Sequence, residues 1–119
     1  MDLLSAIREQ DREALGALVS DDVVFYSPAT VYRGREQVVD LLVLIGGVLE
    51  NVTATGEVDT VTFVKGQSEG DELNGVLVEI RDDEDHIAEI TLLLRPLAAV
   101  QKAVVRLARA LAAGPRQDA

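Results

Sequence analysis

The chain has 119 residues, which suits a single domain over residues 1–119 with one sizeable core. Asp and Glu number 21 against 11 Lys and Arg, and the resulting net charge of −10 makes nucleic acid and anionic membrane unlikely partners by charge repulsion. The absence of cysteine excludes disulfides, thiolate nucleophiles and thiol-ligated zinc, and it fits a reducing compartment, which we expect to be the cytoplasm.

The N-terminal part of the chain predicts two short helices followed by a strand. Apolar residues recur at helical spacing within residues 2–19, with an interruption at which Asp11 can cap the second helix. Ser20-Asp21-Asp22 breaks this pattern, and the β-branched and aromatic residues Val23 to Tyr26 predict a short strand. Ser27-Pro28 ends that strand.

Residues 36–50 predict a longer helix. This segment is apolar on nearly every side from Val38 to Ile45, which indicates burial against a sheet, and Gly46-Gly47 weakens its last turn. Its apolar run from Leu41 to Leu49 is about half as long as a bilayer requires, and the N-terminus shows no apolar signal segment. We therefore expect no membrane span and no secretion signal.

The second half of the chain predicts consecutive β-hairpins and a final helix. Three segments rich in β-branched residues are separated by polar turns: Val58 to Lys65, Leu73 to Arg81 and His86 to Arg95. Residues 97–113 return to helical spacing, and Gly114-Pro115 should stop that helix. This order predicts an α+β fold, in which helices pack on the concave side of a curved antiparallel sheet.

Two segments also carry a family resemblance. The stretches DDVVFYSPATVYRGREQVVDLL and DDEDHIAEITLLLRPL, together with the element order over residues 2–100, resemble the SnoaL-like branch of the nuclear transport factor 2-like superfamily. The resemblance implies a cone-shaped α+β barrel with a pocket between the sheet and the helices. It also implies self-association, so a homodimer is expected. The helix over residues 97–113 looks like an addition to the family's usual domain.

The resemblance does not supply a catalytic residue. The superfamily includes ketosteroid isomerases, epoxide hydrolases, dehydratases and polyketide cyclases, beside members without catalysis. In its isomerase-like members, an Asp immediately before the proline that follows the first strand acts as the catalytic base. Here Ser27 precedes Pro28. Two further positions that hold acids in relatives are occupied by Leu77 and Leu92. A serine without an activating base is too weak to replace the carboxylate, so FYSPATVYRG is interpreted as a turn.

Two titratable residues outside those positions offer alternatives, His86 and Glu79. His86 is the only histidine, and its place after the acidic turn favours a solvated hairpin residue over a catalytic or metal-binding one. Glu79 could act as a buried base, but exposure on the mixed face of its strand is favoured. No metal site and no cofactor are expected.

Strand alternation supplies the candidate ligand pocket. Ala88, Ile90, Leu92 and Leu94 should line the cone, while the opposite face, with Glu89 and Leu93, is interpreted as solvated surface or dimer interface. Alternation alone leaves open which face of the first strand points inward. The candidate pocket residues are Phe25, Tyr26, Ser27, Tyr32, Ile90, Leu92 and Leu94.

Three functions stay open on the sequence alone. The first is a protein that binds a small apolar molecule in the cone without catalysis. The second is a SnoaL-like isomerase, cyclase or hydrolase with a rearranged active site. The third is a dimeric protein-interaction module whose cone is simply filled. The first is favoured, because the predicted cone is apolar and lacks convergent acids.

Overall fold

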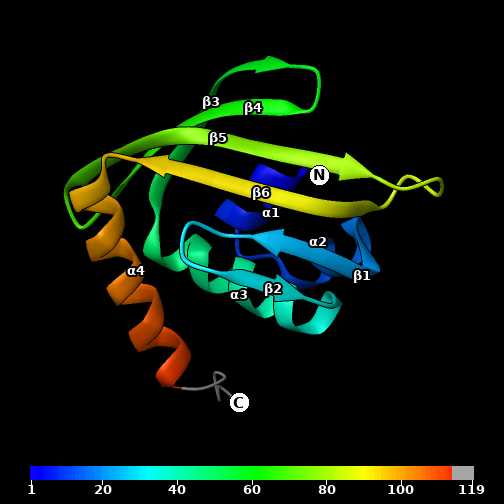
Figure 1. Ribbon diagram of the computed structural model, residues 1–119, viewed down its shortest axis with the longest axis horizontal. Helices are drawn as coiled ribbons and strands as arrows, with labels where there is room; N and C mark the ends of the chain where they lie inside the picture. The colour runs from blue at the N-terminus through cyan, green and yellow to red at the C-terminus, as the bar shows by residue number, and fades with distance from the viewer. Residues whose placement is uncertain (114–119) are drawn as a thin grey trace.

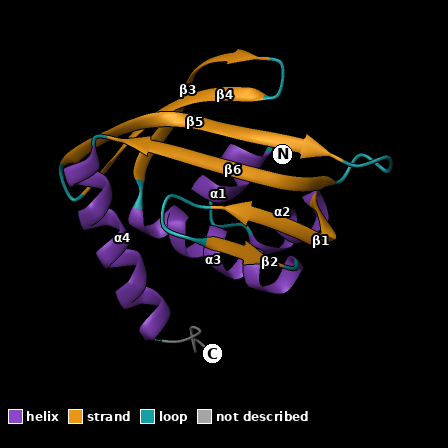
Figure 2. Cartoon of the chain, viewed as in Figure 1, coloured by secondary structure: helices purple, strands orange, loops and turns teal. Residues whose placement is uncertain are grey.

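A computed structural model describes residues 1–113 of the chain (Figure 1). In chain order its elements are α1 (Leu3–Arg8), α2 (Arg12–Leu18), β1 (Val19–Tyr26), β2 (Val31–Arg33), α3 (Arg35–Val48), β3 (Glu50–Val58), β4 (Val61–Ser68), β5 (Asp71–Arg81), β6 (Ile87–Arg95) and α4 (Leu97–Ala112). The strands form one curved sheet, and α1, α2 and α3 lie together beneath it, while α4 crosses one end (Figure 2). The α+β architecture and the C-terminal helix are as the sequence predicts.

The six strands are ordered β2-β1-β6-β5-β4-β3. The predicted hairpins β4–β5 and β5–β6 are present, with Leu77 opposite Leu92 and Val76 opposite Leu93. The prediction that the whole sheet is antiparallel is wrong at one place, because β1 runs parallel to β6, with Phe25 opposite Ile90. The intervening elements, from β2 to β5, form the long connection that a parallel pair needs.

The predictions from the sequence omit β2 and β3 and make β1 too short. β1 begins at Val19, so Ser20-Asp21-Asp22 lies inside the strand instead of breaking the chain. β2 is only three residues long, and β3 is an edge strand in which Val52 alone is buried. Neither strand therefore shows the alternation of apolar and polar residues from which strands are predicted. The segment predicted as one strand from Val58 contains the tight turn between β3 and β4.

The N-terminal helices begin as their capping residues require. The Asp2 and Asp11 carboxylates accept hydrogen bonds from the backbone N–H groups of Ser5 and Ala14, at 2.8 and 3.0 Å. The hydrogen bond from Ser5 lowers the pKa of Asp2 below its ordinary value, since it stabilises the ionised carboxyl group. Capping fixes where two very short helices start.

One buried core joins the helices to the inner face of the sheet. Its fully enclosed members include Leu3, Leu15, Phe25, Leu41 and Ile90. Gly46 permits the close approach of α3 to α1, because a Cβ at this position would lie 2.0 Å from the Ile7 carbonyl oxygen. The glycine pair predicted to weaken α3 thus includes one residue that the packing requires.

Two sequence predictions about the chain ends have separate outcomes. No helix within residues 1–113 is long and apolar enough to cross a membrane. The prediction that Gly114-Pro115 stops the last helix lies outside the described residues.

Candidate functional site

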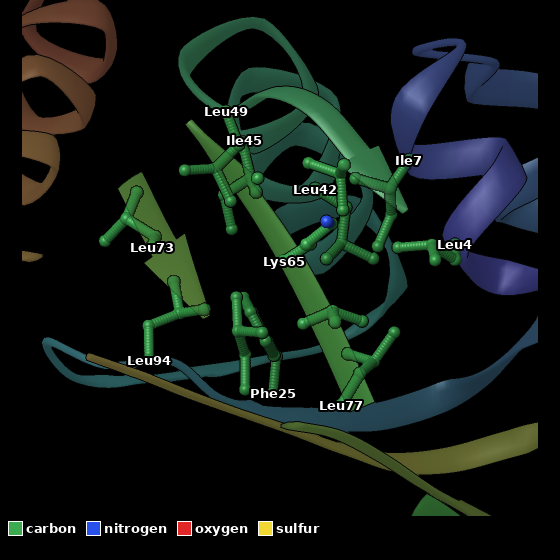
Figure 3. A pocket seen from close by; sticks show the side chains of 14 residues that line it. Leu4, Ile7, Phe25, Leu42, Ile45, Leu49, Lys65, Leu73, Leu77 and Leu94 are labelled. Carbon is green, nitrogen blue, oxygen red and sulfur yellow. The ribbon is translucent and has the colours of Figure 1, made fainter. Parts of the chain in front are cut away.

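The space between the sheet and the helices is a small apolar cavity, which we call the cone cavity. Its volume is ≈ 30 Å³, which is room for about one or two water molecules. Leu4 and Ile7 of α1 lie on one side of it, and Leu73 and Leu94 lie on the side toward α4 (Figure 3). The remaining walls come mainly from the inner faces of the sheet and α3: Phe25, Leu42, Ile45, Leu49, Val52, Val64, Leu77 and Leu92.

A second apolar cavity, which we call the α4 cavity, lies between α3, β6 and α4. It also holds ≈ 30 Å³, and Val100, Val104 and Leu107 of α4 contribute to its walls together with Pro28 of the β1–β2 corner. Four residues line both cavities: Ile45, Leu49, Leu92 and Leu94. The two spaces therefore adjoin, and these four side chains form a wall that they share.

The corner between β1 and β2 is a turn held by Ser27. The Ser27 hydroxyl donates to the Thr30 carbonyl oxygen at 2.7 Å, and it accepts from the backbone N–H groups of Ala29 and Thr30 at 3.2 and 3.0 Å. Every one of these partners belongs to the corner itself, so the hydroxyl stabilises local structure. Its neighbour Pro28 lines the α4 cavity.

The other two positions at which the sequence resemblance implies an acid are part of the apolar wall. Leu77 and Leu92 are buried and lie directly opposite each other on β5 and β6. The one ionisable residue among those that line the cone cavity is Lys65, whose side chain is exposed. The walls of both cavities thus offer no carboxylate or imidazole to a molecule bound inside.

The two alternative titratable residues lie away from the cavities. Glu79 is on the inner face and not, as expected, on the mixed outer face, because its strand alternates from the buried Leu77. Its carboxylate pairs with Arg81 at 3.3 Å. His86 is at the β5–β6 turn, half-exposed, with Nδ1 3.9 Å from a Glu84 carboxylate oxygen. Among the described residues, no cluster of His, Cys, Asp and Glu side chains has a geometry suited to a metal ion.

The structure brings together three of the seven candidate pocket residues at the cone cavity, namely Phe25, Leu92 and Leu94. Ile90 is fully buried in the core nearby, and Tyr32 stacks on Phe25 with ring centroids 6.4 Å apart. Tyr26 points to the other face of the sheet and is 38% exposed. The inward face of β1 is therefore the one that carries Phe25.

Sequence reasoning missed the helical side of the cavity. Leu4, Ile7, Leu42 and Ile45 were recognised only as apolar positions of helices, because helical spacing does not say which of them meet an internal space. On the sheet side, Leu73 and Leu77 were available from the alternation of β5, which has Leu73 and Leu77 buried.

The outer face of the sheet carries exposed apolar side chains in register. Phe63, Val76 and Leu93 are paired across β4, β5 and β6, and we call these three residues the outer row. Phe63 is 44% exposed and Leu93 is 58% exposed. The adjacent register line adds Val61, Val78, Thr91 and Tyr26. Large apolar side chains thus remain on the outer face of the sheet, within the part of the chain that the structure describes.

A polar cluster holds α4 against the turn between β4 and β5. Arg106 Nη1 donates to the carbonyl and hydroxyl oxygens of the fully buried Ser68 at 3.0 and 2.7 Å. Arg106 Nε lies 3.1 Å from a Glu69 carboxylate oxygen, and Asp71 lies 3.9 Å from Arg106 and 3.6 Å from Lys102. We call these five residues the latch.

Comparison with known proteins supports a fold class. No family model matches the sequence, and no curated protein matches it. A crystal structure described as a steroid delta-isomerase from Pseudomonas aeruginosa superposes with a TM-score of 0.85 at 24% identity, covering 92% of this chain and 86% of that one. An uncharacterized protein with a cystatin-like fold from Silicibacter pomeroyi gives a TM-score of 0.84 at 18% identity, with 92% and 82% covered.

A third structure, an NTF2-like protein of unknown function from Cytophaga hutchinsonii, gives a TM-score of 0.64 at 10% identity and covers 79% of this chain and 84% of that one. At these identities the comparisons establish the fold. The chain has the nuclear transport factor 2-like fold, also described as cystatin-like, as the resemblance of its sequence implied.

Proposed function

We propose that this protein binds a small, uncharged apolar molecule in its cone and does not act through the carboxylates used by related enzymes. The observation that carries the proposal is the pair of adjoining cavities, whose inward-facing side chains are apolar throughout. A charged ligand would lose its hydration there without gaining a partner, which is strongly unfavourable. An apolar ligand gains about 25 cal/mol for each Å² of surface that it removes from water.

The arrangement of the corner and the strands supports the non-catalytic part of the proposal. Ser27, Leu77 and Leu92 occupy the positions at which an acid would be needed, and the Ser27 hydroxyl is engaged within its own turn. Proton transfer requires a group of suitable pKa within hydrogen-bond reach of the substrate. Apolar side chains at Leu77 and Leu92, together with a Ser27 hydroxyl that is already engaged, favour binding over proton transfer.

A titration with N-phenyl-1-naphthylamine, an uncharged fluorescent probe of apolar sites, tests the proposal. Leu92→Phe adds volume to the wall shared by both cavities, so it should weaken probe binding at least about tenfold. Leu93→Phe is the matched control, because the next residue points to the outer face and should leave binding unchanged. Equal affinities for Leu92→Phe and the wild type would contradict a site in the cone. Native mass spectrometry of freshly purified protein would then identify any retained molecule.

A second candidate function is a homodimeric interaction module that uses the outer face of the sheet. The outer row favours this candidate, because the exposed Phe63 and Leu93 stand in one line with the half-buried Val76 between them. Lys65 and Arg95 lie beyond this row at one end of the face, and Glu89 lies toward the other. A two-fold axis across the strands would bring the positive end of one subunit to the negative end of its partner.

The size of this face predicts a concentration-dependent dimer. Four strands spaced ~4.8 Å apart and ~30 Å long present roughly 550 Å² per subunit, at the lower end of specific interfaces. Leu93→Asp should therefore yield monomer in analytical ultracentrifugation at concentrations where the wild type is dimeric. Leu97→Asp, at an exposed leucine of α4, is the control. A wild type that stays monomeric at high concentration would contradict this candidate.

A further inference from the structure

Helix α4 is joined to the rest of the protein by a small apolar cluster separate from the main core. This cluster consists of Leu73 with Ala99 and Val100 of α4, against which the half-buried Leu49, Leu94 and Val104 pack. The buried α4 side chains are small ones, Ala99, Val100 and Ala103. The helix thus covers the end of the cone with a modest apolar contact, to which Leu107 in its second half adds a contact with the main core.

The latch supplies the polar part of this attachment. Arg106 is the one residue of α4 that reaches the β4–β5 turn with several nitrogen atoms at once, and its side chain is only 20% exposed. Charge-assisted hydrogen bonds donated by such a largely buried guanidinium are stronger than hydrogen bonds between neutral groups. Breaking the latch leaves α4 held at its junction with β6, by the small apolar cluster, and by Leu107, which packs against the main core.

The two cavities meet beneath this helix. Leu49 and Leu94 line both cavities and also pack against the α4 cluster, so outward movement of α4 frees the side chains that separate the two spaces. As they stand, spaces of ≈ 30 Å³ each are too small for any but the smallest organic molecule. A ligand of ordinary size needs them joined.

The geometry points to α4 as a hinged cover, whose outward movement joins the cone cavity and the α4 cavity into one elongated binding site. The site runs from Leu4 and Ile7 of α1 to Leu107 of α4. Its occupant is an uncharged, elongated apolar molecule, such as an alkyl or isoprenoid chain, because every inward-facing side chain along this path is apolar. This inference rests on the proposed binding function and adds how the site opens and what shape it accepts.

Loosening the latch should strengthen binding. If the open form is the one that binds, the apparent Kd equals the intrinsic Kd divided by the fraction of open molecules. Arg106→Gln removes the ion pairs with Glu69 and Asp71, and we expect about a tenfold lower apparent Kd for N-phenyl-1-naphthylamine with a faster association rate. Asp71→Asn weakens the same latch from the sheet side, which guards against an effect of Arg106→Gln on folding. Arg109→Gln is the matched control on an exposed face of α4.

Stopped-flow fluorescence on the wild type, these three variants and Leu92→Phe separates the possible results. Tighter and faster binding by Arg106→Gln and Asp71→Asn, with Arg109→Gln equal to the wild type, supports the cover. Equal binding by the wild type and all three charge variants, abolished by Leu92→Phe, overturns the cover while leaving the proposed function intact. Failure of every variant to bind the probe overturns both.

Discussion

Two neighbouring glycines of α3 should respond to the same substitution with opposite signs. A Cβ at Gly46 would lie 2.0 Å from the Ile7 carbonyl oxygen, and α1 must move about 1 Å before this contact reaches the shortest separation that Cβ atoms show, 3.0 Å. A Cβ at Gly47 would meet only the flexible Gln10 side chain, at 3.0 Å. Alanine is favoured over glycine within a helix by about 1 kcal/mol, whereas overpacking costs about 1–3 kcal/mol.

We therefore expect Gly46→Ala to lower the free energy of unfolding by about 1–2 kcal/mol, and Gly47→Ala to raise it by up to about 1 kcal/mol. Urea unfolding monitored by circular dichroism, at one fixed protein concentration, measures both variants. With an m-value of about 2 kcal/mol per M, the two midpoints should separate by about 1 M. A Gly46→Ala protein at least as stable as the wild type would refute the close packing of α1 on α3.

Three further substitutions test the caps, the wall and the corner. Asp2→Ala should lower the free energy of unfolding by about 0.5–1 kcal/mol, and Asp2→Asn by less. Because the pKa of Asp2 is lowered in the folded protein, the stability that Asp2 adds over Asn is full above the ordinary carboxyl pKa and is lost as the pH falls through the lowered pKa. Urea unfolding of both proteins at neutral and acid pH measures this loss. Leu92→Ala should cost about 2–5 kcal/mol in urea unfolding yet tighten probe binding, because it thins the shared wall and enlarges the space for the probe; unchanged affinity would count against that wall. Ser27→Ala should cost about 1 kcal/mol and leave probe affinity unchanged, since the hydroxyl bonds only within its turn; altered affinity would place it in the site.

The elements that the sequence predicts well are those whose burial repeats with the period of the element. β5 and β6 alternate between buried and exposed residues, and α3 is buried along most of its length, so each was recognisable. β3 was missed because an exposed edge strand needs no apolar face, and its stability comes from backbone pairing with β4. The parallel pairing of β1 with β6 was missed because it depends on how distant segments meet.

The residues of the candidate site likewise include some that the sequence predicts and some that it does not. Leu92 and Leu94 were predicted to line the cone, and they do, because alternation fixes the face of β6. The direction of Phe25 needed the structure, since the burial of β1 is interrupted by two exposed residues, Asp21 and Asp22. The latch could not have been anticipated, because Arg106 and Ser68 are 38 residues apart and neither belongs to a recognisable motif.

The corner FYSPATVYRG shows why a likeness of fold leaves the chemistry to be decided by single side chains. The corner follows β1 directly, and its Pro28 lines the α4 cavity. A carboxylate at position 27 could accept hydrogen bonds but could donate none to the Thr30 carbonyl oxygen. The Ser27 hydroxyl does both, since it donates to Thr30 and accepts from the backbone N–H groups of Ala29 and Thr30. The Ser27 hydroxyl is thus engaged by the backbone of the corner, and Pro28 lines the α4 cavity. Under the proposed function, ligands of this protein are best sought among uncharged apolar molecules.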